Sequence, residues 1–227
     1  MLNWEKINFV ILDMDGTLLD LHFDNYFWQT HIPEKYAKAH DISLLKAQEY
    51  LNTETNKVSG KIEWYCLDYW TEKLDLPIVE LKKEIKHKIS LRPDTLPFLD
   101  ALRNANKKVV LVTNAHPDSL SLKVERTALD KHIDLLISTH TYGATKESQT
   151  LWQKLQADLQ FNNDTTLFVD DSLTILDSAK QFGIKHLLAV ANPDSKRPRL
   201  NDVQLKGYPF ITDYRDITDD IVEHNWV

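Results

Sequence analysis

Cysteine is nearly absent from this chain of 227 residues, which contains only Cys66. An internal disulfide and a zinc site built from several cysteines of the chain are therefore excluded. Long apolar runs are missing as well, since none approaches the ~18 uninterrupted residues that a membrane-spanning helix needs. The first apolar run is short and is broken by Asp13. We therefore expect neither a signal peptide nor membrane association, and we expect a cytoplasmic location.

Positive charge is also scarce, since 27 Lys and Arg against 34 Asp and Glu give a net charge of −7. This balance argues against a nucleic-acid partner, because surfaces that coat nucleic acid need clustered Lys and Arg. It is compatible with a small anionic substrate, because a bound metal ion can reverse the local electrostatic potential. A length of 227 residues suits one well-buried core, or one domain with a modest insertion.

Short apolar runs are the clearest secondary-structure signal. Five of them predict β-strands, at residues 9–12, 109–112, 135–138, 167–169 and 187–190. Each is apolar on both faces, which is typical of strands buried on both sides of a parallel sheet. Helical patterns lie between or after the later strands, at residues 118–128, 147–159 and 174–182. This alternation predicts a doubly wound, Rossmann-like α/β fold with right-handed crossovers.

The connection between the first two predicted strands is the exception. It spans about 90 residues, which is far too long for one crossover. Four of its segments have helical periodicity, at residues 24–31, 43–51, 62–74 and 78–89. We therefore predict an α/β core, residues 1–20 and 92–227, and an inserted α-helical cap, residues 21–91. The cap would cover the carboxyl ends of the strands, where open α/β sheets bind ligands.

Two further segments carry local expectations. Within residues 62–74, Cys66 shares one helical face with Ile62, Tyr65 and Tyr69. A lone cysteine on such an aromatic face is expected to pack in the interior rather than act as a nucleophile. Residues 192–209 contain three prolines and several basic residues, and we expect a surface loop.

Two aspartates stand where the first predicted strand ends. Asp13 and Asp15 are two residues apart, so in extended backbone they point to the same side. Gly16 allows the chain to turn sharply away. The pattern Asp-x-Asp-Gly also begins calcium-binding EF-hand loops. Here it follows a strand rather than a helix, and the later ligands and terminal glutamate of such loops are missing.

A second acidic pair, Asp170 and Asp171, ends the fourth predicted strand. We expect this strand to neighbour the first, which would bring four carboxylates to one edge of the sheet. Two unit charges at ~4 Å repel by about 4 kcal/mol at an effective dielectric constant near 20. Such a cluster must take up protons or bind a cation. Oxygen ligands without His or Cys favour a hard ion, and we predict Mg²⁺.

The other strand ends offer groups that bind an anion. Thr113 and Asn114 end the second strand, just before a helix that Pro117 begins. A hydroxyl group and backbone N–H groups at a helix start suit a phosphate. Lys146 follows the third strand, and a lone lysine there is ordinarily on the surface. Together with the other strand-end residues it would neutralise phosphate charge.

The ordered set of Asp13-Met14-Asp15-Gly16-Thr17, Thr113-Asn114, Lys146 and Asp170-Asp171 resembles the four motifs of the haloacid dehalogenase superfamily. The helical insertion resembles the type-one cap of that superfamily. The resemblance spans most of the chain and implies a phosphohydrolase that works through an aspartyl-phosphate.

The resemblance also implies a role for each residue. Asp13 would attack phosphorus, and Asp15 would protonate the leaving alkoxide and then activate water. Thr113, Asn114 and Lys146 would hold the phosphoryl group. Asp13, the backbone carbonyl group of Asp15, and Asp171 would ligate Mg²⁺. Asp170 would do so directly or through water.

Two positions depart from the family pattern. Many members have an aspartate where this chain has Ile175, so this chain matches the metal-binding pattern of the family only in part. The family lysine is often followed by proline, and here Glu147 follows it.

The same motifs bear on three other functions. Dehalogenating members lack the second acid, so Asp15 argues against a halogenated substrate. Phosphomutases such as β-phosphoglucomutase keep both acids and the same cap type, so they and sugar-phosphate phosphatases remain the alternative. An inactive binding module is disfavoured because the set of acids, threonine and lysine is intact.

The predicted cap is rich in aromatic residues, at 23–28 and 64–70. Aromatic residues at helical spacing ordinarily form a core, but these rings occupy more than one face and would suit stacking on a nucleobase. The cap segments and two strand-end segments resemble bacterial purine 5′-mononucleotidases that act on GMP and IMP. This resemblance implies a small-molecule substrate, a purine mononucleotide. Asn25 and Asp68 are candidates for hydrogen bonds to the base.

Overall fold

A parallel β-sheet forms the centre of the molecule, for which a computed structural model describes residues 2–223. Its six strands are ordered β3-β2-β1-β4-β5-β6, and every neighbouring pair is parallel. The strands are β1 (Phe9–Leu12), β2 (Lys108–Thr113), β3 (Leu135–Ser138), β4 (Thr166–Asp170), β5 (His186–Val190) and β6 (Phe210–Ile211). The first and fourth strands are neighbours, as predicted, with Leu12 beside Val169.

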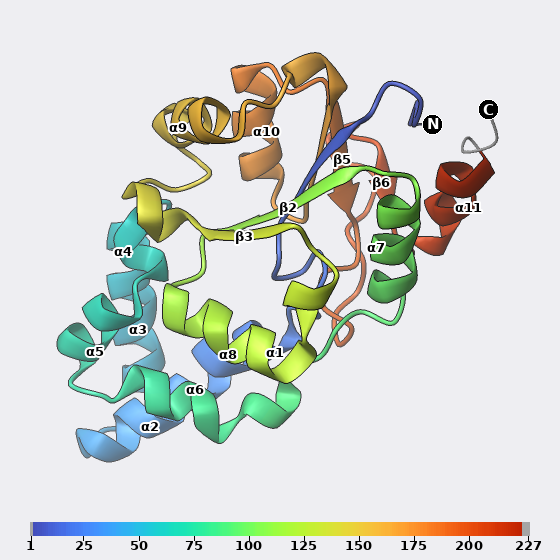
Figure 1. Cartoon of the computed structure of the whole chain (residues 1–227). Helices are drawn as coiled ribbons and strands as arrows, with labels where there is room; N and C mark the ends of the chain where they lie inside the picture. Colours follow the sequence, from blue (N-terminus) through green and yellow to red (C-terminus); the bar gives the residue numbers. More distant parts are fainter. Residues whose placement is uncertain (1, 224–227) are drawn as a thin grey trace.

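Both faces of the sheet are buried at its centre, because the side chains of β1, β2, β4 and β5 alternate between two apolar clusters. Val10 and Leu12 pack in one cluster and Ile11 in the other. Helices α7 (Thr95–Asn104), α8 (Pro117–Thr127) and α11 (Arg215–Glu223) cover the first face. Helices α9 (Gln149–Leu159) and α10 (Leu173–Phe182) cover the second, as Figure 1 shows. The arrangement is the predicted doubly wound α/β fold.

Helices inserted between β1 and α7 gather beside the carboxyl ends of the strands (Figure 1). They are α1 (His22–Tyr26), a π-helical turn η1 (Phe27–His31), α2 (Ile32–Ala39), α3 (Leu44–Val58), α4 (Ile62–Tyr65), α5 (Leu67–Leu74), α6 (Ile78–Glu84) and a 3₁₀ turn η2 (Lys86–Lys88). The two connections to the core run side by side. Leu19 bridges Leu91, and the N–H group of Asp20 donates to the carbonyl oxygen of Ser90 at 3.0 Å.

The five predicted strands are confirmed, each to within one residue at either end. The predicted helices 118–128, 147–159 and 174–182 are confirmed to within two residues. Helices α7 and α11 and the short strand β6 were not predicted. Three 3₁₀ turns complete the connections: η3 (Leu129–Lys131), η4 (Thr139–Tyr142) and η5 (Asn163–Thr165). No helix within residues 2–223 is long and apolar enough to cross a membrane.

One prediction about the cap was wrong. The segment 62–74 is not one helix, because Cys66 has extended backbone angles, φ −81° and ψ 113°, and begins α5 as its N-cap residue. The expected face shared with Ile62 and Tyr69 therefore does not exist, and Cys66 is only partly buried. Residues 192–209 form the expected loop, although Asp194 and Leu205 within it are buried.

Candidate active site

A cavity of about 240 Å³ opens where the carboxyl ends of the strands meet the inserted helices. Seven of the predicted site residues line it: Asp13, Asp15, Thr113, Asn114, Lys146, Asp170 and Asp171. These residues end or follow four different strands, and the parallel sheet brings the strand ends together at one edge. The predicted convergence of acids, threonine and lysine is therefore present as geometry.

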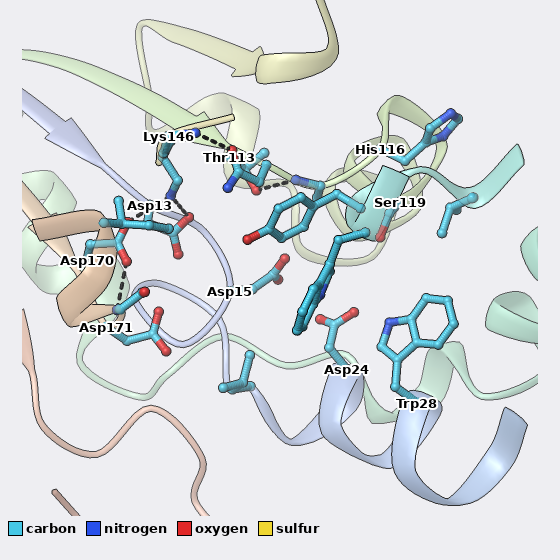
Figure 2. A pocket seen from close by; sticks show the side chains of 18 of the residues that line it. Asp13, Asp15, Asp24, Trp28, Thr113, His116, Ser119, Lys146, Asp170 and Asp171 are labelled. Carbon is cyan, nitrogen blue, oxygen red and sulfur yellow. Dashed lines mark hydrogen bonds and ion pairs between the residues drawn. The ribbon is translucent and has the colours of Figure 1, made fainter. Parts of the chain in front are cut away.

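Lys146 is buried at the centre of this group, with a side chain that is 1% exposed. Its ammonium group donates to Asp13 Oδ1, and to Asp170 Oδ2 at 2.8 Å (Figure 2). The two carboxylates raise the pKa of Lys146 because their attraction outweighs the effect of burial. Lys146 is thus a permanent cation beside Asp13.

Asp13, Asp170 and Asp171 form a compact set of oxygen ligands, with one oxygen of each within 4.8 Å of the others. Burial raises the pKa of Asp13 to about 6, against the opposing effect of Lys146. Burial also raises the pKa of Asp171 well above its usual range, and Asp170 and Asp13 add to the rise. Burial and mutual repulsion thus disfavour the ionised form of these carboxyls; with all three ionised, they would hold more negative charge than Lys146 neutralises, and a divalent cation would relieve that repulsion.

Gly16 makes the close approach of Asp171 possible. Its φ of +86° lies in the left-handed region, and a Cβ atom at this position would stand 2.6 Å from Oδ2 of Asp171. The turn predicted after Asp15 therefore serves a second purpose, because it leaves room for an acidic side chain from another strand.

A second charged network was not predicted and starts at Asp15. Lys123 of α8 contacts Asp15 Oδ1 at 2.7 Å and Asp24 Oδ2 at 2.6 Å. Lys82 of α6 contacts the other oxygen of Asp24 at 2.8 Å. Burial raises the pKa of Asp15 to about 6, and Lys123 opposes that rise. The network thus connects Asp15 with two inserted helices.

The sequence held a signal for both lysines. Lys82 occupies the i+4 position of an apolar helical stripe that contains Ile78, Leu81 and Ile85, and all four residues are buried. Lys123 likewise lies beside Leu122 on the buried face of α8. A lysine on a buried face rarely stays unpaired, so each position indicates an ion pair without identifying its partner.

Asn114 and Glu147 join the second and third strand ends. The Asn114 side chain accepts from the N–H group of Lys146 at 2.9 Å and donates to Glu147 at 3.0 Å. Tyr65, from the inserted helices, donates its hydroxyl proton to the other oxygen of Glu147 at 2.8 Å. Glu147, where the family often has proline, therefore contacts the helices above the cavity.

The cavity has two chemically different ends. Figure 2 shows Asp13, Asp170, Asp171 and Lys146 at one end, with Asp15 nearer its middle. Trp28 and His116 lie at the other. Further apolar lining comes from Trp64, Tyr65, Leu67 and Ile175.

The structure does not bring Asn25 and Asp68 into this cavity. The carboxamide group of Asn25 donates to Asp194 at 2.7 Å, which directs it toward the loop after β5. The side chain of Asp68 is 80% exposed and lies 3.5 Å from Nε2 of His116. Trp28, Trp64, His116 and Ser119 line the cavity instead.

Known proteins with similar sequences and structures point to one family. The family model described as haloacid dehalogenase-like hydrolase matches residues 10–189. The GMP/IMP nucleotidase YrfG of Escherichia coli is 46% identical over 212 residues, which covers 93% of this chain and 94% of that protein.

Two solved structures share the fold. A haloacid dehalogenase phosphatase from Thermococcus onnurineus superposes with a TM-score of 0.75 at 22% identity, over 95% of this chain and 98% of that one. An L-2-haloacid dehalogenase from Xanthobacter autotrophicus gives 0.62 at 17% identity, over 94% and 97%. The fold is thus common to phosphatases and dehalogenases, while the range that the family model matches contains all the residues that line the cavity. The chain belongs to the haloacid dehalogenase-like hydrolase family.

Proposed function

We propose that this protein is a Mg²⁺-dependent 5′-nucleotidase that hydrolyses purine mononucleotides such as GMP and IMP. The observation that carries the proposal is the two-ended cavity. Two aspartates from one strand end face it beside a buried lysine, and tryptophans line it on the side of the inserted helices. A phosphate ester whose leaving nucleoside carries a flat, aromatic base suits such a cavity.

Asp13 is the proposed nucleophile. Its carboxylate attacks phosphorus, the bond to the ester oxygen breaks, and an aspartyl-phosphate forms. Lys146, which contacts Asp13, and the hydroxyl group of Thr113 hold the phosphoryl oxygens, and Asn114 keeps the Lys146 backbone in place. Phosphate monoesters are among the slowest biological substrates to hydrolyse unaided, so a positioned nucleophile and cationic stabilisation are both needed.

Asp15 is the proposed general acid and base. It protonates the leaving 5′ oxygen of the nucleoside, and the resulting carboxylate then takes a proton from the water that attacks the aspartyl-phosphate. Lys123 is a positioning residue that holds Asp15 at 2.7 Å. Free phosphate leaves, Asp13 is again a free carboxylate, and Asp15 is again protonated.

The carboxylate set fits Mg²⁺. Asp13, Asp171 and the backbone carbonyl group of Asp15 would hold the ion, with Asp170 as a direct or water-mediated ligand. Their closely spaced oxygen atoms, whose common ionisation burial and mutual repulsion oppose, support this assignment because a bound cation would offset that repulsion. When bound, Mg²⁺ would neutralise charge that develops on the transferring phosphoryl group.

We also propose that residues 21–91 act as the substrate-selecting cap over a core of residues 1–20 and 92–227, in a cytoplasmic enzyme. Support for the purine comes from the name of the E. coli relative, a GMP/IMP nucleotidase. It also comes from Trp28 and Trp64 on the cap side of the cavity. Specificity would then reside in rings and polar groups that stand far from Asp13.

A substrate panel tests the proposal. Purified protein is given GMP, IMP, AMP, a pyrimidine nucleotide, sugar phosphates and an aryl phosphate, with Mg²⁺ or with a chelator. We expect Mg²⁺-dependent phosphate release, fastest with GMP and IMP, and no turnover by Asp13→Asn. Equal rates with all esters would refute the nucleotidase but leave the phosphatase. Interconversion of sugar phosphates without free phosphate would indicate a mutase.

A further inference from the structure

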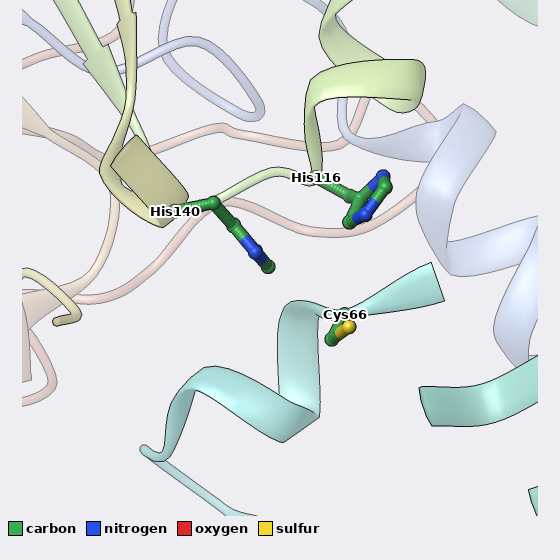
Figure 3. Close-up of side chains that lie close together, drawn as sticks. All are labelled: Cys66, His116 and His140. Atoms are coloured by element: carbon green, nitrogen blue, oxygen red, sulfur yellow. The ribbon is translucent and has the colours of Figure 1, made fainter. Parts of the chain in front are cut away.

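Three side chains of types that bind metals lie together at the end of the cavity that His116 lines: Cys66, His116 and His140 (Figure 3). The sulfur atom and one ring nitrogen of each histidine all lie within 4.8 Å of one another. The residues come from three separate elements. Cys66 precedes α5, His116 precedes α8, and His140 belongs to the turn η4 after β3. The cluster therefore spans the boundary between the inserted helices and the strand ends.

His140 has unused binding capacity. Its Nε2 atom is buried, and among residues 2–223 it has no hydrogen-bond partner. Buried polar atoms in proteins are nearly always paired, so an unpaired ring nitrogen beside a thiol and a second imidazole calls for an explanation. The rings of His116 and His140 pack edge to face with centroids 5.1 Å apart.

The sulfur of Cys66 is also suitably placed. It accepts the N–H group of Tyr69 at 3.5 Å, at the start of the eight-residue helix α5. The positive end of a helix dipole favours negative charge at this position. A thiolate is the form in which cysteine binds metal.

Two carboxylates could complete the cluster. Asp68 Oδ2 lies 3.5 Å from His116 Nε2, and its exposed side chain is free to turn toward an ion. The other ring nitrogen of His116, Nδ1, accepts the N–H group of Asp118 at 3.3 Å, and Asp118 Oδ2 lies 3.7 Å from the same nitrogen. The hydrogen bond from the Asp118 backbone orients the imidazole ring. One sulfur, two nitrogens and one oxygen make a four-ligand set.

We propose that Cys66, His116, His140 and Asp68 form a binding site for Zn²⁺ or a similar borderline-soft divalent ion. Sulfur and imidazole ligands select such ions over Mg²⁺, whereas the set of Asp13, Asp170 and Asp171 offers oxygen alone. Tetrahedral zinc brings its ligands to about 3.5 Å from one another. In the present arrangement the ligand atoms of Cys66, His116 and His140 lie within 4.8 Å of one another, and Asp68 Oδ2 lies 3.5 Å from His116 Nε2.

Binding at this site would join the inserted helices to the core. The hydroxyl group of Tyr65, the residue before Cys66, already links the two parts through Glu147 at 2.8 Å. An ion held by Cys66 on one side and by His116 and His140 on the other adds a second link. The bound ion should therefore raise the melting temperature, because it binds the folded chain alone. This inference does not depend on the proposed substrate.

The test uses the full chain, stripped with a chelator, returned to Mg²⁺ and titrated with Co²⁺. A thiolate ligand gives Co²⁺ a strong near-ultraviolet absorption band, which carboxylate ligands do not. We expect one equivalent of this band in the wild type and also in Asp171→Asn, where the carboxylate set is incomplete. Zn²⁺ should displace Co²⁺ and raise the melting temperature of both proteins.

Two variants make the test specific. Cys66→Ser keeps a good N-cap residue for α5, so it should fold, as circular dichroism will check. It should lose the band and more than ~100-fold of its Zn²⁺ affinity. His140→Gln should lose Zn²⁺ affinity too, whereas His87→Gln, an exposed histidine, is the matched control and should not. Absence of the band in the wild type, or unchanged Zn²⁺ affinity in folded Cys66→Ser, would overturn the proposal.

Discussion

The ammonium nitrogen of Lys123 lies 2.7 Å from Oδ1 of Asp15, the residue that we propose as the general acid and base. The same nitrogen lies 2.6 Å from Asp24 of α1. One buried cation therefore connects the end of β1 with the first inserted helix. The position of Asp15 depends in this way on the packing of the inserted helices as well as on its own strand.

Replacing Lys123 tests this dependence. Lys123→Met keeps much of the side-chain volume but leaves Asp15 without the cation that holds it. We expect kcat with IMP to fall by up to ~100-fold with little change in KM, because general acid catalysis contributes about that much. The loss should be smaller with an aryl phosphate, whose leaving group needs less protonation. Lys131→Met, at an exposed position, is the control, and equal losses with both substrates would contradict a positioning role.

Asp24 is expected to stabilise the fold in a pH-dependent way. Burial acts to raise the pKa of Asp24, but Lys123 and Lys82 outweigh it and hold that pKa well below the ordinary value of 3.8. The folded state thus binds fewer protons than the unfolded state at pH values just below 3.8. The contribution of Asp24 to the free energy of unfolding is therefore fully present above that pH. It is lost as the pH falls toward the pKa of the folded state.

The measurement is urea unfolding of the wild type and Asp24→Asn between pH 7 and pH 3. At pH 7 the variant should be less stable by about 3 kcal/mol, because two buried lysines lose their common partner. The difference should shrink below pH 4. The exposed Asp130→Asn serves as the control. If Asp24→Asn and Asp130→Asn were equally stable at pH 7, the network would have no structural importance.

The strand ends were predictable and the cap contacts were not. Asp13, Thr113, Lys146 and Asp170 each follow an apolar run, and parallel strands bring such positions to one edge whatever the rest of the chain does. The pairing of Lys123 with Asp15 and Asp24 depends on how α8 meets α1, and no local pattern encodes that meeting. The break at Cys66 was missed because helical periodicity continues across it in the sequence.

Gly16→Ala should disturb the metal site more than the fold. The backbone at Gly16 has φ +86°, and a Cβ atom would stand 2.6 Å from Oδ2 of Asp171, which must then move. We expect the Mg²⁺ concentration for half-maximal activity to rise by about tenfold or more. Gly207→Ala is the matched control, because φ is +76° there but nothing lies within 4 Å of the added atom. A similar Mg²⁺ requirement in both variants would argue against Asp171 as a ligand.

Trp64 should contribute to base selection. It lines the cavity, and 37% of its surface is exposed, so its loss leaves no cavity in the core. A stacked base contributes about 1–3 kcal/mol, by analogy with aromatic side chains that bind nucleotides. Trp64→Ala should therefore raise KM for GMP and IMP by roughly 5- to 100-fold, while Trp64→Phe should recover most of the affinity because it keeps a ring. KM for a small aryl or sugar phosphate, whose phosphate end is unchanged, should stay the same. Phe210→Ala removes a comparably exposed ring on β6, far from this cavity, and should alter neither value. A uniform rise in KM for all substrates would instead show that Trp64 supports the fold of the cap, and the purine would then have to stack elsewhere, with Trp28 the next residue to replace.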